Sequence, residues 1–403
     1  MIYPNAKYEI FVCDSYGNIL APFNIVDFNL FLEMSITRGV GEIGACYIRL
    51  SGGGNSTAVL TFMARFGLLR KDAILVIYRT IGNQRSLLLD TVFFIRSVEQ
   101  FREATGSFVI KITAYDTNYL LSSRLTTAQK NNKPETAYKT ETLSQTMYEL
   151  VRDNIGSQSG IRQMTNFTES RELPTYGYTI EKYSSSDGMS FYYMNLLDAL
   201  QQLNQLSTTP IEVNDEIYPV YFDVVAIDAN SFVFQQFAQQ RGVDRRFSSG
   251  TNRTALISDT MGQMTEVSFV ADWQNEKTAA YSVFQNITGN AKVDPVRVQD
   301  IRRVANTPFS VREVVYNSPV KDVTASGNSF LKEPVNYPTF TAYAKLQDSP
   351  GFLYGIDWGY GDYITINIFG TFVDVRINAI SFNLTNKSET IQVSLQVTET
   401  FSF

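Results

Sequence analysis

The chain has 403 residues, of which 44% are hydrophobic and 13% aromatic, so it can form two or three domains with apolar cores. It contains no histidine and therefore lacks the usual general base and the usual zinc ligand, which excludes a Ser-His-Asp or Cys-His site. Its net charge of −6 disfavours binding of nucleic acid over the whole surface, because that binding needs cations that release phosphate counterions.

Residues 1–125 are predicted to form short strands with turn signals between them. The glycine run Gly52, Gly53 and Gly54 reads as a flexible hairpin tip, because it lacks the spacing and the following helix of a phosphate-binding loop. Regularly spaced short strands are typical of a β-barrel or a β-sandwich. The expected strands cover residues 8–13, 23–32, 47–50, 73–78, 91–98 and 108–115.

The N-terminus and the cysteines do not match those of a secreted protein with a disulfide framework. The first residues, MIYPNAKYEIF, lack the basic start, the apolar run and the cleavage site of a signal peptide. No stretch approaches the ~18 apolar residues of a membrane helix. Cys13 and Cys46 lie in apolar, strand-like surroundings, which favours two buried thiols over a disulfide. We therefore expect a soluble protein that is made in the cytoplasm and does not insert into a membrane.

Residues 126–215 are predicted to form a smaller, helix-containing domain. They open with a polar stretch around Pro134 that suits a linker. Apolar residues then recur at helical spacing from Leu143 to Ile155, and again over about 193–206. The segment between them, 157–190, is rich in Ser, Thr, Gly and Tyr and reads as loop or irregular hairpin.

Residues 216–403 return to a strand pattern. Residues 290–335 are charged and polar, and they are predicted to form an irregular insert. The last part of the chain is the most regular, because apolar residues alternate over three consecutive segments between Tyr363 and Val397. That pattern predicts an antiparallel meander with one buried face, and the whole chain reads as a β-dominated α+β fold. The other expected strands cover residues 221–227, 232–237, 267–271, 280–287 and 339–344.

The C-terminal meander has a looser copy near the start of the chain. Asp72 precedes the run AILVI at 73–77 much as Asp362 precedes the run YITIN at 363–367. In each copy the second strand carries one arginine, Arg96 or Arg376, and a third strand follows. The repeated order of turn, strand, strand and strand predicts a duplicated strand module.

Short motifs along the chain resemble those of the tail hub proteins, or baseplate hub proteins, of long-tailed bacteriophages. The run ITAYD at 112–116 followed by YLLSSR at 119–124 resembles the end of the first barrel in that family. The run RGVDR at 241–245 resembles the Gly-x-Asp-Arg segment that starts the second half, and residues 354–364 resemble a segment near the C-terminus. Residues 290–335 depart from the family pattern, which has a helix ending in Leu there; only 328–331 match it.

The resemblance implies two tube-like antiparallel β-barrel domains, at residues 1–125 and 216–403, with the helper domain at 126–215 between them. Such hubs are homotrimers, in which two similar barrels per chain present six modules to a hexameric tail tube. The implied partners are a tail tube or distal tail protein above, tip or fibre proteins below, a tape-measure protein in the channel, and DNA that passes without specific binding. The implied place is the tail tip of the virion, after assembly in the host cytoplasm. No cofactor, metal or catalytic residue is implied.

Several polar residues have two interpretations. Arg302, Arg303 and Arg312 beside Glu313 form either a solvated face or a set of ion pairs between subunits. Together with Gly52, Gly53 and Gly54 they are the predicted interface residues. Asp362 is expected to cap its own turn rather than to bind a metal or act as an acid. Asp223, Asp228, Asp272 and Glu276 could serve a glycosidase, which needs two carboxyls beside a sugar bond, but no spacing selects a pair.

Two other functions therefore stand beside the structural hub. One is a distal-tail ring or a receptor-binding protein; a hexamer in solution would favour a ring protein, whereas a trimer would favour the hub. The other is a cell-wall glycan-binding module or a carboxylate-dependent hydrolase. Activity on peptidoglycan that disappears when one carboxylate is neutralised would favour the hydrolase.

Overall fold

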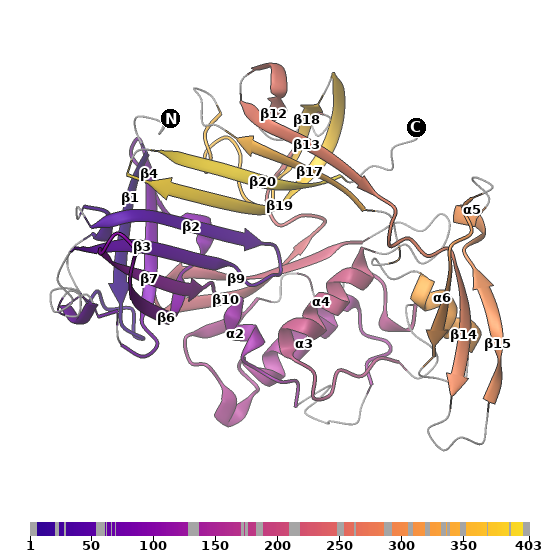
Figure 1. The fold of residues 1–403 in the computed structure, drawn as a ribbon. Coiled ribbons are helices and arrows are strands. Elements are labelled where there is room, and N and C mark those ends of the chain that lie inside the picture. The colour runs from indigo at the N-terminus through magenta and orange to yellow at the C-terminus, as the bar shows by residue number, and fades with distance from the viewer. Residues whose placement is uncertain are drawn as a thin grey trace.

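Strands dominate the computed structural model, which confirms the predicted β-dominated α+β class. The described strands form one sheet of 14 strands and two sheets of three (Figure 1). The structure describes residues 6–20, 24–27, 30–53, 61, 63–65, 67–68, 70–127, 137–170, 173, 176–182, 188–208, 218–247, 254–261, 263–285, 292–304, 309–318, 323–331, 336, 339–346, 352–368, 370–386 and 388–397.

The first module is an antiparallel sheet in the order β2-β3-β7-β6-β4-β1. Its short strand β5 pairs β4, and two 3-10 turns, η1 and η2, connect strands. The elements are β1 (Ala6–Cys13), η1 (Ile25–Asp27), β2 (Phe31–Gly39), β3 (Ala45–Gly53), β4 (Ile74–Ile81), β5 (Gln84–Leu87), η2 (Leu88–Asp90), β6 (Phe93–Arg102) and β7 (Phe108–Tyr115).

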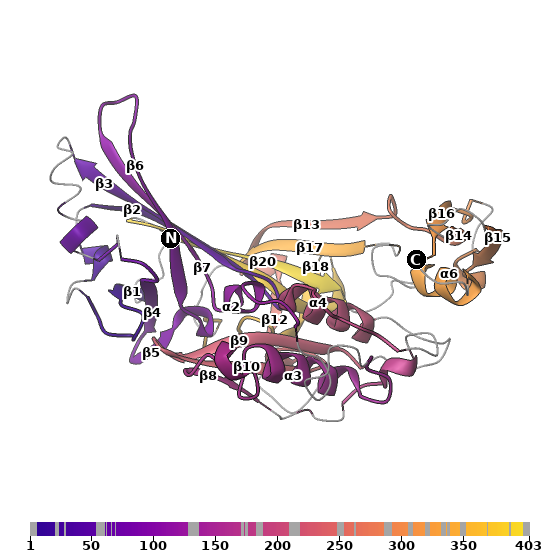
Figure 2. The same cartoon turned by 90° about the horizontal axis from the view of Figure 1, so that it is seen from below.

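Two predictions for this module are wrong. The strand expected at 23–32 begins only at Phe31, because Ile25–Asp27 form a 3-10 turn. The glycine run is not a hairpin tip over its first two residues: Gly52 and Gly53 continue β3, and Gly53 lies opposite Phe108 of β7. β3 follows β7 outward into the long β6–β7 hairpin that projects in Figure 2. Gly54 lies outside the described residues.

The second module is built from the C-terminal strands, in the order β13-β17-β20-β19-β18. The predicted meander is confirmed, because β18, β19 and β20 pair consecutively and antiparallel. Two short strands, β11 and β12, pair beside β18 in parallel. The elements are β11 (Asp244–Arg245), β12 (Leu256–Ser258), η6 (Asp259–Met261), β13 (Met264–Asp272), β17 (Thr339–Leu346), β18 (Tyr363–Ile368), β19 (Thr371–Thr385) and β20 (Glu389–Val397).

The two modules share one topology. With β5 and β11 set aside, each has a main sheet of six strands, ordered second, third, sixth, fifth, fourth and first by chain position. Their fifth strands, β6 and β19, carry a bulge at the same place, at Arg96 and at Asn378. One difference is the direction of the first strand: β1 is antiparallel to β4, whereas β12 is parallel to β18. The duplication predicted from the sequence is therefore present in the strand order.

The alignment of the two copies predicted from the sequence is wrong by one residue. When the bulges are matched, Leu75 and Ile77 correspond to Ile364 and Ile366, and all four face the same core. Asp72 then corresponds to Gly361, and both have a positive φ, 57° and 84°. A shift of one residue moves every side chain of a strand to the other face of the sheet. Matching Asp72 with Asp362 would therefore pair core residues of one module with residues on the opposite face of the other.

A continuous sheet joins the two modules. Seven residues of β19, from Ala379 to Thr385, lie opposite Gly39 to Glu33 of β2, so the edge of one module is paired by the other. Ile36 and Met34 of β2 and Phe382 and Leu384 of β19 point into a single apolar core shared by both modules. This sharing explains why the alternating apolar residues of both modules are buried on the same side.

The helper region packs on the opposite face of the first module. Its helices α3 (Leu143–Asn154) and α4 (Leu196–Ser207) lie at the predicted places and are capped by the side chains of Thr142 and Asn195. They share a core with Ile74 and Val76 of β4, so that strand is buried on both faces. The remaining elements are α2 (Tyr119–Ser122), η4 (Gly160–Arg162), β8 (Phe167–Glu169), η5 (Ile180–Lys182), β9 (Val220–Asp228) and β10 (Ser231–Ala238).

Two boundaries differ from the predicted ones. The β9–β10 hairpin pairs β8 and shares the core of α3 and α4, so the helper region reaches Ala238 rather than residue 215. The region predicted to be irregular is a folded insert between β13 and β17, seen at the right of Figure 1. Its helix α6 spans Val323–Leu331, so it begins five residues before the stretch 328–331 that was expected to match the family helix. The insert comprises β14 (Ala279–Gln285), β15 (Lys292–Gln299), α5 (Ile301–Val304), β16 (Glu313–Asn317) and α6 (Val323–Leu331).

Candidate functional site: the polar face of the sheet and the seam between modules

The long sheet has one polar face that crosses both modules. Residues that lie directly opposite each other on neighbouring strands point to the same side, so each row can be followed across the sheet. One row carries only hydroxyl, amide and phenol side chains: Ser97, Thr113, Tyr47, Ser35, Asn383 and Thr390. The corresponding row of the second module carries Ser268, Tyr343 and Ser394.

Several charges on this face form ion pairs with each other. Arg49 on β3 bridges Glu33 and Glu103 at 2.8 and 2.9 Å, and Lys345 on β17 pairs with Glu266. Exposed pairs of this kind stabilise the fold by at most ~1 kcal/mol, but they leave little net positive charge on the face. In the rows of this face that the structure describes, hydroxyls and ion-paired side chains form no array of cations with which to hold a phosphate backbone.

The seam where the two modules and the helper region meet is organised around a buried carboxylate. Asp223 of β9 is fully buried and accepts hydrogen bonds from the Gly41 backbone N–H at 3.2 Å and the Asn118 side chain at 2.8 Å. It also pairs with Arg241, between β10 and β11, at 2.5 Å, and with the hydroxyl of Tyr360 at 3.3 Å. One side chain therefore ties together the three parts of the molecule.

Arg38 of β2 is the buried cation at the centre of the same seam. Its Nε lies 3.2 Å from Asp116 and its Nη2 3.6 Å from Asp223, and all three side chains are fully buried. The guanidinium also donates to the backbone carbonyls of Leu89 and Val224. Burial raises the pKa of Asp116 to about 7, even though the charge of Arg38 opposes that rise.

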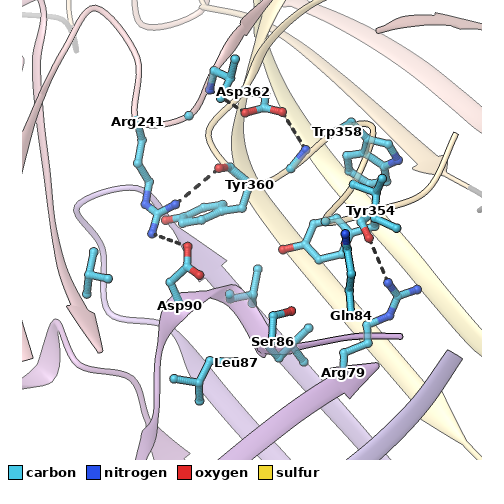
Figure 3. A pocket seen from close by; sticks show the side chains of 18 of the residues that line it. Arg79, Gln84, Ser86, Leu87, Asp90, Arg241, Tyr354, Trp358, Tyr360 and Asp362 are labelled. Carbon is cyan, nitrogen blue, oxygen red and sulfur yellow. Dashed lines mark hydrogen bonds and ion pairs between the residues drawn. The ribbon is translucent and has the colours of Figure 1, made fainter. Parts of the chain in front are cut away.

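A crevice of about 450 Å³ opens along this seam (Figure 3). Arg241 reaches Asp90 and the carbonyl of Tyr360, while Arg79 donates to the carbonyl of Tyr354 at 3.1 Å. Arg79 also pairs with Glu389 of the second module at 3.0 Å. Because these charged groups hold one another, the geometry is that of a joint between modules rather than of a catalytic pocket.

Asp362 caps its own turn, as predicted, and it does more than that. It accepts from the backbone N–H of Gly359 at 2.8 Å, but also from Val243 at 2.7 Å, and it pairs with Arg245 at 2.9 Å. Gly242 packs so closely on this turn that an added Cβ would lie 2.6 Å from the backbone N of Asp362. Burial raises the pKa of Asp362 in this setting.

The predicted interface arginines have partners within the insert and next to it. Arg303 pairs with Asp300 at 2.9 Å and donates to the carbonyls of Leu331 and Asn336, each at 2.8 Å. Arg312 pairs with Glu276, whereas the neighbouring Glu313 pairs with Arg297. Arg302 lies in α5. The interface role of all six predicted residues stays a prediction.

The carboxylates considered for a glycosidase do not form a pair. Asp223 belongs to the seam, and Glu276 is engaged by Arg312. Asp228 and Asp272 each accept a backbone N–H two residues further on, from Asn230 at 2.7 Å and from Gln274 at 2.8 Å. Four separate structural roles account for the four side chains.

The cysteines and possible metal ligands complete the description of the polar side chains. Cys13 and Cys46 are buried free thiols, as predicted. Within the described ranges, no group of three or more acidic or sulfur ligands could hold a metal ion. Of the helices described, none is long and apolar enough to cross a membrane.

Sequence reasoning did not find Arg38, Asp116 or Arg241 as members of the seam. The available signal was weak: Arg38 interrupts an apolar strand, and RGVDR at 241–245 was noted only as a motif. Arg38 lies about 80 residues from Asp116 and about 190 from Asp223, and no local pattern encodes such pairs. Arg241 is much nearer to Asp223 in the chain, but a strand turn and a loop separate them.

Comparison with known proteins identifies the fold. No protein-family model matches the sequence, and no curated protein sequence matches it. The crystal structure of a tail protein from Neisseria meningitidis MC58 is similar over 97% of each chain, with a TM-score of 0.52 and 12% identity. The 43 kDa tail protein of prophage MuSo2 from Shewanella oneidensis has the same TM-score, 0.52, and 12% identity over 96% of this chain and 98% of its own. At this identity the likeness shows a shared fold.

Proposed function

We propose that this protein is a structural tail hub, which closes the tail tube of a phage or of a related injection machine and lines its exit channel. The observation that carries the proposal is the duplicated module: two copies of one sheet topology lie in one chain and are joined edge to edge. Three chains then present six equivalent modules, which adapts a sixfold tube to a threefold tip. The fold shared with a tail protein from Neisseria meningitidis and a prophage tail protein from Shewanella oneidensis supports this role.

The polar face of the sheet is the proposed channel lining. Its hydroxyls and paired charges would let DNA and a tape-measure protein pass without being held, in keeping with the overall charge of −6. The proposed partners are a tail tube or distal tail protein on one side of the ring and tip or fibre proteins on the other. Assembly would take place in the host cytoplasm and end at the tail tip of the virion. The proposed role requires no enzymatic activity and no cofactor.

The mass of the full chain in solution tests this proposal. A trimer is expected by native mass spectrometry or light scattering, and particle images should show a ring with six inner densities. A hexamer would favour the distal-tail ring protein instead, and a monodisperse monomer at high concentration would overturn both.

A hydrolase acting on cell-wall glycan is the third candidate, and the structure supplies an observation against it. The four carboxylates considered for catalysis are held in separate structural contacts. If the purified protein released soluble fragments from peptidoglycan, and Glu276→Gln abolished that release, the hydrolase would be favoured over the hub.

A further inference from the structure

The junction between the two modules defines a way in which one module edge pairs with another. β19 runs beyond its bulge at Asn378, and its last residues, 379–385, take β2 of the first module as a new partner. On its other side this part of β19 stays paired with β20. The bulge therefore separates the part of β19 that pairs β18 from the part that reaches the neighbouring module.

β6 is the counterpart of β19 and has the same form. It runs beyond its bulge at Arg96 while staying paired with β7. β4 reaches only Phe93 and Phe94 at the start of β6. Among the described strands, none pairs the outer side of residues 97–102. The counterpart of β2 is β13, which pairs β17 on one side and is an end strand of the sheet.

The register that β6 and β13 would have as a pair follows from the register of β19 with β2. Ser97 corresponds to Ala379, because each residue follows the bulge directly. Ser268 corresponds to Ser35, because they lie opposite Tyr343 and Tyr47, and those two lie opposite Ser394 and Thr113. Ala379 pairs with Gly39 within the chain, and the corresponding pair is Ser97 with Asp272.

We propose that β6 of one copy pairs antiparallel with β13 of a second copy, just as β19 pairs with β2 within the chain. In this register Ser97 lies opposite Asp272, Glu99 opposite Val270, and Phe101 opposite Ser268. The proposal rests on the trimeric hub of the preceding section and specifies how its copies join. Each chain uses one β6 and one β13, so the contact is head to tail and a ring closes when the third copy meets the first.

The side chains at both edges suit this pairing. Val98 and Val267 already pack partly against the shared core, and pairing places them on the core side of the continued sheet. Phe101 and Val270, on the other face, are 40% and 46% exposed in the single chain. An exposed strand edge with apolar side chains is a template for pairing, and a second copy covers it.

A disulfide cross-link tests the register directly. The full chain carrying Glu99→Cys and Val270→Cys is oxidised mildly and run on a denaturing gel without reductant; the native thiols Cys13 and Cys46 are buried. We expect covalent trimers from the double variant and none from either single variant. The matched control carries Glu99→Cys with Thr265→Cys, which lies about 17 Å further along the strand, too far for a disulfide. It should cross-link at least about tenfold more slowly.

The outcomes separate the edge pairing from the hub itself. A trimer by mass that fails to cross-link, or cross-links as fast in the control, overturns the edge pairing and leaves the hub in place. A cross-linked ladder that ends at six chains supports the edge pairing and overturns the trimer. A monomer before oxidation overturns the hub and the edge pairing together. Circular dichroism of each variant serves as the control for folding.

Discussion

Tyr47 and Tyr343 occupy the same position in the two modules. Tyr47 lies between Ser35 and Thr113 on neighbouring strands, and Tyr343 lies between Ser268 and Ser394; each tyrosine is 40% exposed. Two residues after each tyrosine in its strand lies a cation, and the two form the ion pairs Arg49–Glu33 and Lys345–Glu266. The likeness of the modules thus extends from strand order to individual side chains of the polar face.

Asp223→Ala is expected to lower the free energy of unfolding by about 3–5 kcal/mol, because it leaves buried Arg38 without one of its two carboxylates and removes the buried partner of Arg241. Urea denaturation followed by tryptophan fluorescence, to which Trp358 in the seam contributes, measures the change. Asp228→Ala is the control, because Asp228 is exposed and only caps a turn; its cost should stay near 1 kcal/mol. Equal losses for the two variants would contradict the role assigned to Asp223.

Asp116→Asn should change how stability depends on pH. The folded pKa of Asp116 is raised to about 7 from 3.8, so between these values the folded protein holds a proton that the unfolded chain releases. The contribution of this group is therefore fully present below pH 3.8 and is lost as the pH rises through about 7. Unfolding free energies measured from pH 4 to 8 should fall less steeply in the variant than in the parent. Parallel curves would show that Asp116 titrates as in the unfolded chain.

Asp362→Asn should destabilise the protein by about 2–3 kcal/mol, because it turns an amide toward two backbone donors and weakens the ion pair with Arg245. Asp72→Asn is the matched control near the equivalent turn. Its pair with Arg96 is exposed, and asparagine tolerates the positive φ of 57°. We expect a loss below about 1 kcal/mol there. Thermal unfolding of both variants gives the comparison, and a larger loss in Asp72→Asn would refute it.

Arg303→Ala separates a structural role from the predicted interface role. Loss of its bonds to the carbonyls of Leu331 and Asn336 should destabilise the insert by about 2 kcal/mol. Hydrogen exchange should speed up in α6, while the mass of the assembly stays that of the parent. Arg297→Ala, which breaks an exposed pair, serves as the control. Dissociation of the assembly in Arg303→Ala alone would instead establish the interface role.

Strand positions were predictable where one face is buried and the other is polar. The meander from Tyr363 to Val397 alternates clearly, and it was placed correctly because each side chain type reports its face. The insert was expected to be irregular, and its regular elements other than the strand at 280–287 were missed for the opposite reason. It is small, and in its described part the apolar cluster has three buried members, Ala280, Val298 and Leu331, so its strands carry little periodic signal.

Neither the hairpin at 220–238 nor the seam could be placed from local pattern. The hairpin was predicted as a hairpin but assigned to the wrong part of the chain, because its partner β8 is only three residues long. Asp223 was noticed for its charge and interpreted as a candidate acid. Its partners Gly41, Asn118 and Arg241 come from three parts of the fold and meet only after folding.

The turn between β2 and β3 and the insert between β13 and β17 lie at corresponding points of the two modules. In the first module, Gly41 at that turn is bonded to Asp223 and to the side chain of Gln201, so the helper region covers it. In the second module the insert, with its own sheet, stands at this point, and β13 and β17 still pair beside it. Sequence change and length variation among relatives should therefore collect between residues 273 and 338, while the turn at residues 40–44 tolerates neither.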